Sequence, residues 1–295
     1  KGAFMFTITV DTSCEERKSV LKEMGIPYIP LTYIIDDKEY SDEFSTDEEF
    51  HNFYELIRKG AMPSTSQITE YAHEEFFEKV AKENNATQIM HLGLSTGLSS
   101  TYENSVRAAQ KVSAKLGIEV VSVNTVSASQ GNALVLDYAI ELRNQGVPFK
   151  EACEKVEAFA HRVQHWIVVN DLYHLKRGGR VSGAAAAFGT MLNLKPILNI
   201  NNEGKLFVVN KVRGMNKALQ TVLQSIEKYA VQKPNFSARI ATADNWEDAE
   251  KLVQLIRAKY PQAQIKTGWI GPVIGAHTGP GVVAVVFETE KRIEK

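Results

Sequence analysis

The chain has 295 residues, of which 44% are hydrophobic and 23% charged, and its 34 basic residues nearly balance its 35 acidic residues. This length and composition are typical of a globular protein with one large domain or two ordinary ones. The even charge balance, without long charge clusters, argues against a nucleic-acid-binding surface and against a polybasic membrane patch.

Membrane and export signals are also missing from the sequence. No apolar run approaches the roughly 18 residues that a transmembrane helix needs. The first residues do not follow the order of charged region, apolar run and cleavage site that marks a signal peptide. The two cysteines, Cys14 and Cys153, lie far apart without metal-ligand spacing, so we expect free thiols in a reducing compartment. The predicted location is the cytoplasm.

Strand and helix patterns alternate through the first half of the chain. Runs rich in β-branched residues are followed by amphipathic stretches, an order that predicts a Rossmann-like parallel sheet with helices on both faces. An Asp36-Asp37 pair between two apolar runs predicts a small hairpin. The expected strands are residues 4–10, 29–35, 38–40, 88–92 and 118–123, and the expected helices are residues 15–24, 47–59, 68–83, 102–116 and 128–145.

The pattern changes after about residue 163, where we expect a second α/β domain with mixed strand directions. We therefore predict an N-terminal domain over residues 1–163 and a C-terminal domain over residues 164–295. The second domain is expected to contain strands at residues 166–169, 195–200, 205–210, 238–243, 264–269 and 281–287, and helices at residues 216–229 and 246–259.

Two loops rich in hydroxyl side chains, residues 63–67 and 95–101, are each expected to open a helix. A helix start offers unpaired backbone N–H groups and the positive end of the macrodipole. With Ser and Thr side chains added, it forms a neutral, donor-rich place for an anion such as a carboxylate or a phosphate. In a parallel sheet, ligands bind beyond the carboxyl ends of the strands, where Asp11 and the second loop fall. We interpret Asp11 as an anchor for these loops.

Six motifs in chain order resemble the DegV family of bacterial fatty-acid-binding proteins, over nearly the whole chain. They are Thr65-Ser66-Gln67, Leu94-Ser-Thr-Gly-Leu-Ser99-Ser-Thr101-Tyr, Leu175-Lys-Arg-Gly-Gly-Arg180, Leu192-Asn-Leu-Lys-Pro196, Lys211-Val-Arg213-Gly214 and His277-Thr-Gly-Pro-Gly281. The resemblance implies two α/β domains that enclose one long-chain fatty acid, such as palmitate, stearate or oleate, in the cleft between them. It also implies that the protein presents the acid to a separate fatty acid kinase.

The same resemblance assigns the fatty-acid-binding residues. It places the carboxylate contacts on Thr65 and Ser99, beside Ser66, and associates His277 and Arg180 with the head-group network and the kinase encounter. No catalytic residue, metal or cofactor is expected, and apolar residues 184–188 and 191–194 are candidates for the tunnel that holds the tail.

The chain departs from the family pattern at several points. Asp11-Thr12 stands where the family usually has Asp-Ser, and Asn124-Thr125 stands where the family has a second Asp-Ser, after the fourth strand. None of these departures removes a hydroxyl proposed to touch the ligand. From the residues alone, Thr65 and Ser99 are also compatible with simple helix capping.

Two other functions are open at this point. A serine hydrolase could use Ser99 or Ser95 with His277 and an Asp, although no Gly-x-Ser-x-Gly elbow is present. A phosphoryl-transfer enzyme or sugar-phosphate binder would need clustered Asp residues for Mg²⁺. Of the three readings, a fatty-acid carrier without chemistry of its own is the preferred one.

Overall fold

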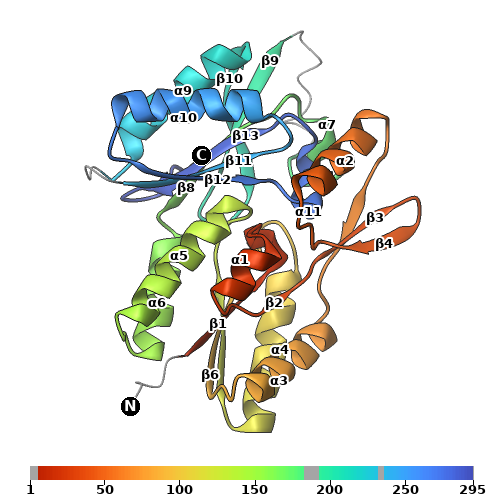
Figure 1. Ribbon diagram of the computed structural model, residues 1–295, viewed down its shortest axis with the longest axis vertical. Helices are drawn as coiled ribbons and strands as arrows, with labels where there is room; N and C mark the ends of the chain where they lie inside the picture. Colours follow the sequence, from red (N-terminus) through yellow and green to blue (C-terminus); the bar gives the residue numbers. More distant parts are fainter. Residues whose placement is uncertain (1–5, 183–192, 232–235, 295) are drawn as a thin grey trace.

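The computed structural model describes residues 6–182, 193–231 and 236–294 (Figure 1). A sheet of four parallel strands, in the order β2-β1-β6-β7, forms the centre of the first half. Its strands are β1 (Thr7–Asp11), β2 (Tyr28–Ile29), β6 (Gln88–Gly93) and β7 (Glu119–Asn124). Parallel strands need crossover connections, and the intervening helices supply them.

Helices cover both faces of this sheet, as predicted. Phe77 and Val112 belong to one apolar cluster, in which two helices pack on β6 and β7, and Leu134 and Val156 belong to a separate cluster on the other face. The helices of this half are α1 (Lys18–Glu23), α3 (Glu70–Glu83), α4 (Thr101–Leu116), α5 (Gln130–Asn144) and α6 (Phe149–Ala160).

A small antiparallel sheet and one helix extend from the first half toward the second (Figure 1). The sheet has the order β4-β3-β5, with β3 (Thr32–Ile35) and β4 (Lys38–Ser41) joined by the predicted turn, where both aspartates have positive φ. The helix α2 (Asp47–Arg58) begins with a capping box formed by Thr46 and Glu49.

The prediction that residues 63–67 open a helix is wrong. Ser64–Ser66 form the strand β5, which pairs with β3, and the next helix begins only at Glu70. Thr69 caps that helix by accepting a hydrogen bond from the Ala72 backbone N–H. The N-cap is therefore a hydroxyl residue that follows the predicted loop.

The second half contains a mixed sheet, as predicted, and its six strands have the order β10-β9-β8-β13-β11-β12. Only β11 and β12 are parallel among its neighbouring pairs. Two amphipathic helices, α9 and α10, cover one face (Figure 1), where Leu219 and Leu252 are buried against Ile240. The elements are β8 (Val163–Val168), β9 (Leu194–Ile200), β10 (Leu206–Arg213), α9 (Met215–Tyr229), β11 (Ser237–Thr242), α10 (Trp246–Lys259), β12 (Gln264–Trp269) and β13 (Val283–Glu288).

Several elements differ from the prediction. The helix expected over residues 15–24 is present but shorter, as α1, and a 3-10 turn, η1 (Thr12–Cys14), precedes it. Helices α6, α7 (Tyr173–Arg177) and α11 (Pro272–Thr278) were not predicted. For α11 the reason is composition, because Gly275 and the flanking Gly and Pro residues are typical of a turn. Gly275 is nevertheless required there, since a Cβ would lie 2.5 Å from the Tyr54 hydroxyl.

The two halves share an apolar core. Residues of β3 and α2, such as Tyr33 and Phe53, belong to one cluster with Val273 of α11 and Ala284 of β13. The division at residues 163 and 164 stays a prediction, and it falls at the start of β8, the first strand of the mixed sheet. Within the described part of the chain, every helix is too short or too polar to cross a bilayer.

Candidate functional site

A cavity of about 300 Å³ lies between the two halves. Apolar side chains of the mixed sheet, of α11 and of loops from both halves make up most of its wall, and polar side chains gather where the two hydroxyl loops meet α11 and the segment after α7. All five predicted binding residues line it. The apolar lining is Leu31, Leu94, Leu98, Ala128, Ile167, Leu175, Ile200, Leu206, Ala241, Ile270, Val273, Ile274, Ala284 and Val286, and the polar residues near the loops are Thr65, Ser66, Gln67, Ser99, Ser100, Arg180, His277 and Thr278.

Thr65 and His277, 212 residues apart in the sequence, are hydrogen-bonded in the site. The Thr65 Oγ1 of β5 lies 2.8 Å from the His277 Nε2 in the last turn of α11. Burial, and then the nearby cations Arg180 and Arg177, lower the pKa of His277 to about 4. The imidazole is therefore neutral at neutral pH, and it can exchange a hydrogen bond with a ligand without carrying a charge.

The backbone of Gly178 lies against the other side of the His277 ring. A Cβ at Gly178 would lie 2.2 Å from the His277 Nδ1, so only glycine leaves room for this ring position. The Nδ1 atom is buried without a hydrogen-bond partner among the described residues. The imidazole is thus held by packing on one side and by Thr65 on the other.

Ser99 lies where the second hydroxyl loop opens α4, as predicted. Its Oγ accepts a hydrogen bond from the Thr101 N–H at 3.2 Å and lies 3.0 Å from the Thr101 Oγ1. The Thr101 hydroxyl in turn accepts from the Ile68 N–H, and Asn104 donates to the Ile68 carbonyl at 2.7 Å. This network joins the second loop to the segment after the first, so both capping and a ligand contact are available to Ser99.

Arg180 brings a guanidinium group to the cavity. Arg180 donates from Nε to the Leu98 carbonyl at 3.2 Å and also bonds the Gly178 carbonyl. It is half-buried and forms no ion pair with a described residue, which leaves its charge available to an anionic ligand. Burial lowers the pKa of Arg180, but a guanidinium stays protonated at neutral pH.

Arg177 was not predicted as part of the site. Its Nη2 donates to the Pro63 carbonyl at 2.8 Å and to the Ala276 carbonyl at 3.1 Å. It therefore fixes the start of the first loop to α11, next to His277. The only sequence signal for this role is a basic residue in the Leu175–Arg180 motif, because both acceptors are backbone atoms distant in sequence.

Asp11 and Ser95 hold the loops in place. Asp11 is buried and accepts from the Leu94 N–H at 2.8 Å and from the Ser13 N–H at 2.9 Å, which agrees with the anchoring role. The Ser95 hydroxyl donates at 2.9 Å to the Gly204 carbonyl in the β9–β10 turn. This contact docks the second half on the loop.

Most of the candidates for the tail tunnel lie outside the residues that the structure describes. Residues 184–188, 191 and 192 lie outside the described residues, and Leu194 begins β9 without lining the cavity. The apolar lining instead comes from the mixed sheet, from α7 and α11, and from loops of both halves.

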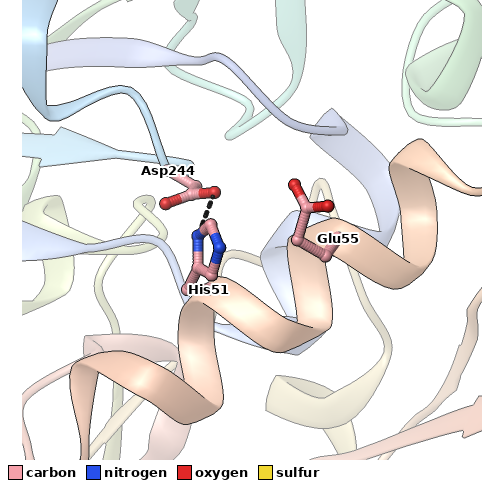
Figure 2. A group of neighbouring side chains, drawn as sticks. All are labelled: His51, Glu55 and Asp244. Atoms are coloured by element: carbon pink, nitrogen blue, oxygen red, sulfur yellow. Dashed lines mark hydrogen bonds and ion pairs between the residues drawn. The ribbon is translucent and has the colours of Figure 1, made fainter.

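One group of side chains has the composition of a metal site. Ligand atoms of His51, Glu55 and Asp244 all lie within 4.8 Å of one another, and Figure 2 shows His51 and Glu55 on α2 with Asp244 opposite them. Arg58 lies 2.8 Å from Glu55 and also bonds Asp244, so both carboxylates already pair with one guanidinium. We interpret the group as an ion-pair cluster that ties α2 to the segment after β11.

The fold and the site together define a class of protein: two α/β halves, one on a parallel and one on a mixed sheet, that enclose an apolar cavity with a polar rim of hydroxyl, imidazole and guanidinium groups. The comparisons with known proteins identify the family. The protein-family model described as "Uncharacterised protein, DegV family" matches residues 5–290 of this chain. A DegV domain-containing protein of Clostridium perfringens is 37% identical over 283 residues, which cover 96% of this chain and 97% of that protein.

Two solved structures have the same fold. A DegV family protein from Thermus thermophilus, whose structure is described as showing fatty acid binding, has a TM-score of 0.86 and 26% identity, over 97% of this chain and 99% of the other. The fatty acid kinase B3 protein of Streptococcus pneumoniae, loaded with linoleic acid, has a TM-score of 0.82 over 97% of this chain and 100% of the other, and at 19% identity it shows the fold alone. The chain belongs to the DegV family.

Proposed function

We propose that this protein binds one long-chain fatty acid, such as palmitate, stearate or oleate. Thr65, Ser66, Ser99, His277 and Arg180 would hold the carboxylate, and the apolar cavity would hold the tail. The observation that carries this proposal is the placement of all five side chains at the rim of one cavity whose remaining wall is mainly apolar. The fatty acid binding described for the Thermus thermophilus relative supports it.

The physical properties of the cavity favour a fatty acid over a phosphate ester. Burying a methylene group contributes about 0.8 kcal/mol, so a sixteen-carbon tail contributes roughly 11 kcal/mol before the costs of ordering and association. Hydroxyl donors and one guanidinium keep a partly buried carboxylate ionised. The tail therefore supplies most of the affinity, and the rim supplies the orientation.

We further propose that the protein is a carrier rather than an enzyme. A serine hydrolase needs a base within hydrogen-bond reach of its nucleophile. Here the His277 imidazole contacts Thr65, while the Ser99 and Ser95 hydroxyls are engaged by Thr101 and by the Gly204 carbonyl. This arrangement gives the hydrolase alternative no support.

The partner that we propose is a fatty acid kinase. Ser66 and Ser100 at the rim are exposed, whereas the apolar lining is largely buried, so a bound acid would present its carboxylate near the surface and keep its tail inside. This orientation suits transfer of a phosphoryl group to the carboxylate by a second protein. The cytoplasm is the proposed location, and the two free, buried cysteines agree with a reducing compartment.

Extraction of the purified protein tests the proposal. Protein expressed in a bacterial host is denatured, extracted with organic solvent and examined by mass spectrometry for fatty acids in stoichiometric amount. We expect about one long-chain acid per chain. An empty extract, together with no rise in melting temperature when palmitate or oleate is added, would contradict the proposal.

A further inference from the structure

A thin polar layer separates the apolar cavity from a second cavity of about 690 Å³. Gln130, the first residue of α5, is 2% exposed and is the one described residue that lines both cavities. Beside it, the hydroxyl of Ser129, which lines the first cavity, bonds the carboxylate of Glu15, which lines the second. The two cavities therefore meet at these side chains.

The Gln130 side chain is fixed from two sides. Its Oε1 accepts a hydrogen bond at 2.8 Å from the Nη1 of Arg239, which is 3% exposed and is itself held by ion pairs to Glu16 and Asp137. On the other side, Gly268 has no side chain, and a Cβ there would lie 2.5 Å from the Gln130 Nε2. The Arg239 hydrogen bond therefore holds the amide at the boundary between the cavities, in the space that Gly268 leaves open.

The second cavity opens to the surface and has an aromatic wall. The exposed charged side chains of Lys266 and Asp47 are part of its lining. Trp269 stacks on Phe50 at 5.1 Å between ring centroids, and Trp246 meets Trp269 edge-on at 5.2 Å. An apolar chain that passed Gln130 would reach this aromatic wall.

We propose that Gln130 closes the far end of the acyl cavity and sets the longest fatty acid that the protein accepts. This inference rests on the proposed function. A tail that ends short of the amide is enclosed by a mainly apolar wall, which also contains the buried imidazole of His165. A longer tail meets the Gln130 side chain, which occupies the boundary between the two cavities and is held there by Arg239 and its two carboxylates.

A pair of substitutions tests this role on the delipidated full-length protein. Gln130→Ala removes the closing side chain, while Gln130→Leu replaces the amide by an apolar group of similar size. Gln67→Ala is the matched control, because Gln67 lines the acyl cavity but not the second one. Affinities for palmitate, stearate, arachidate and behenate are measured for each variant by calorimetry, and melting temperatures report folding.

We expect the ratio of behenate affinity to palmitate affinity to be about tenfold or more higher in Gln130→Ala than in the wild type. The reason is that each added methylene that contacts an apolar surface improves binding. Gln130→Leu and Gln67→Ala should keep the wild-type order of affinities. A folded Gln130→Ala variant with the wild-type order, or the same change in Gln130→Leu, would overturn the proposal. Failure of the wild type to bind any of the four acids would contradict the proposed function instead.

Discussion

Replacing Thr65 by valine isolates one hydroxyl of the proposed carboxylate site. Valine keeps the shape of the side chain and removes the Oγ1 atom that lies 2.8 Å from the His277 Nε2. A hydrogen bond to a charged group contributes about 1.5–3 kcal/mol, and removal of one donor also leaves the buried imidazole without its partner. The expected loss of palmitate affinity is therefore about tenfold to 150-fold.

Calorimetric titration of delipidated protein with palmitate and with hexadecanol measures this loss. The alcohol has the same tail without the charge, so its affinity should fall less than that of palmitate. Thr278→Val is the control, because Thr278 also lines the cavity but its hydroxyl bonds the Ile274 carbonyl within its own helix at 3.2 Å. Palmitate affinity within twofold of the wild type in Thr65→Val would refute the assignment of this hydroxyl to the carboxylate.

Three further predictions concern the second loop, one buried acid and the β9–β10 turn that contacts the second loop. Ser99→Ala should weaken palmitate binding through loss of one donor worth about 1–3 kcal/mol, and unchanged affinity in the same titration would remove Ser99 from the site. Asp42 directly follows β4, and burial raises its pKa to about 8. Between about pH 4 and about pH 8 the folded state therefore keeps a proton that the unfolded state releases, so the free energy of unfolding falls as the pH rises. From about pH 4 to about pH 8 the free energy of unfolding, measured in denaturant, should therefore fall less in Asp42→Asn than in the wild type, by on the order of a few kcal/mol. Parallel pH profiles of the two proteins would contradict this prediction. Gly204→Ala should lower the melting temperature, because φ is +75° there and a Cβ would overlap the Ser95 hydroxyl, and a melting temperature equal to that of the wild type would show that the docked turn adjusts freely.

Much of the fold was predictable because its strands and long helices bury regular apolar patterns. The bounds of β12 and α10 agree with the prediction, and the β9–β10 hairpin follows from two apolar runs around the turn at residues 201–204. Short elements were not predictable in this way. In α11, packing against Tyr54 selects Gly275, and local propensity alone favours a turn at such a sequence.

The site was predictable only in part, for a related reason. The order of the family motifs indicated Thr65, Ser99, Arg180 and His277, and the structure brings all four to one cavity. The roles of Arg177 and Gln130 depend on contacts with backbone atoms and side chains about 100 residues away. No local pattern carries such information, because these contacts exist only after the two halves have packed together.

The central claim is that the polar rim holds a carboxylate while the cavity holds the tail. Titration of the delipidated protein with palmitate and with methyl palmitate tests both parts at once, since the ester has the same tail and no charge. We expect one palmitate to bind per chain and the ester to bind at least about tenfold more weakly, because its charge-assisted hydrogen bonds are lost. Equal affinity for the two compounds, or no binding of either, would contradict it.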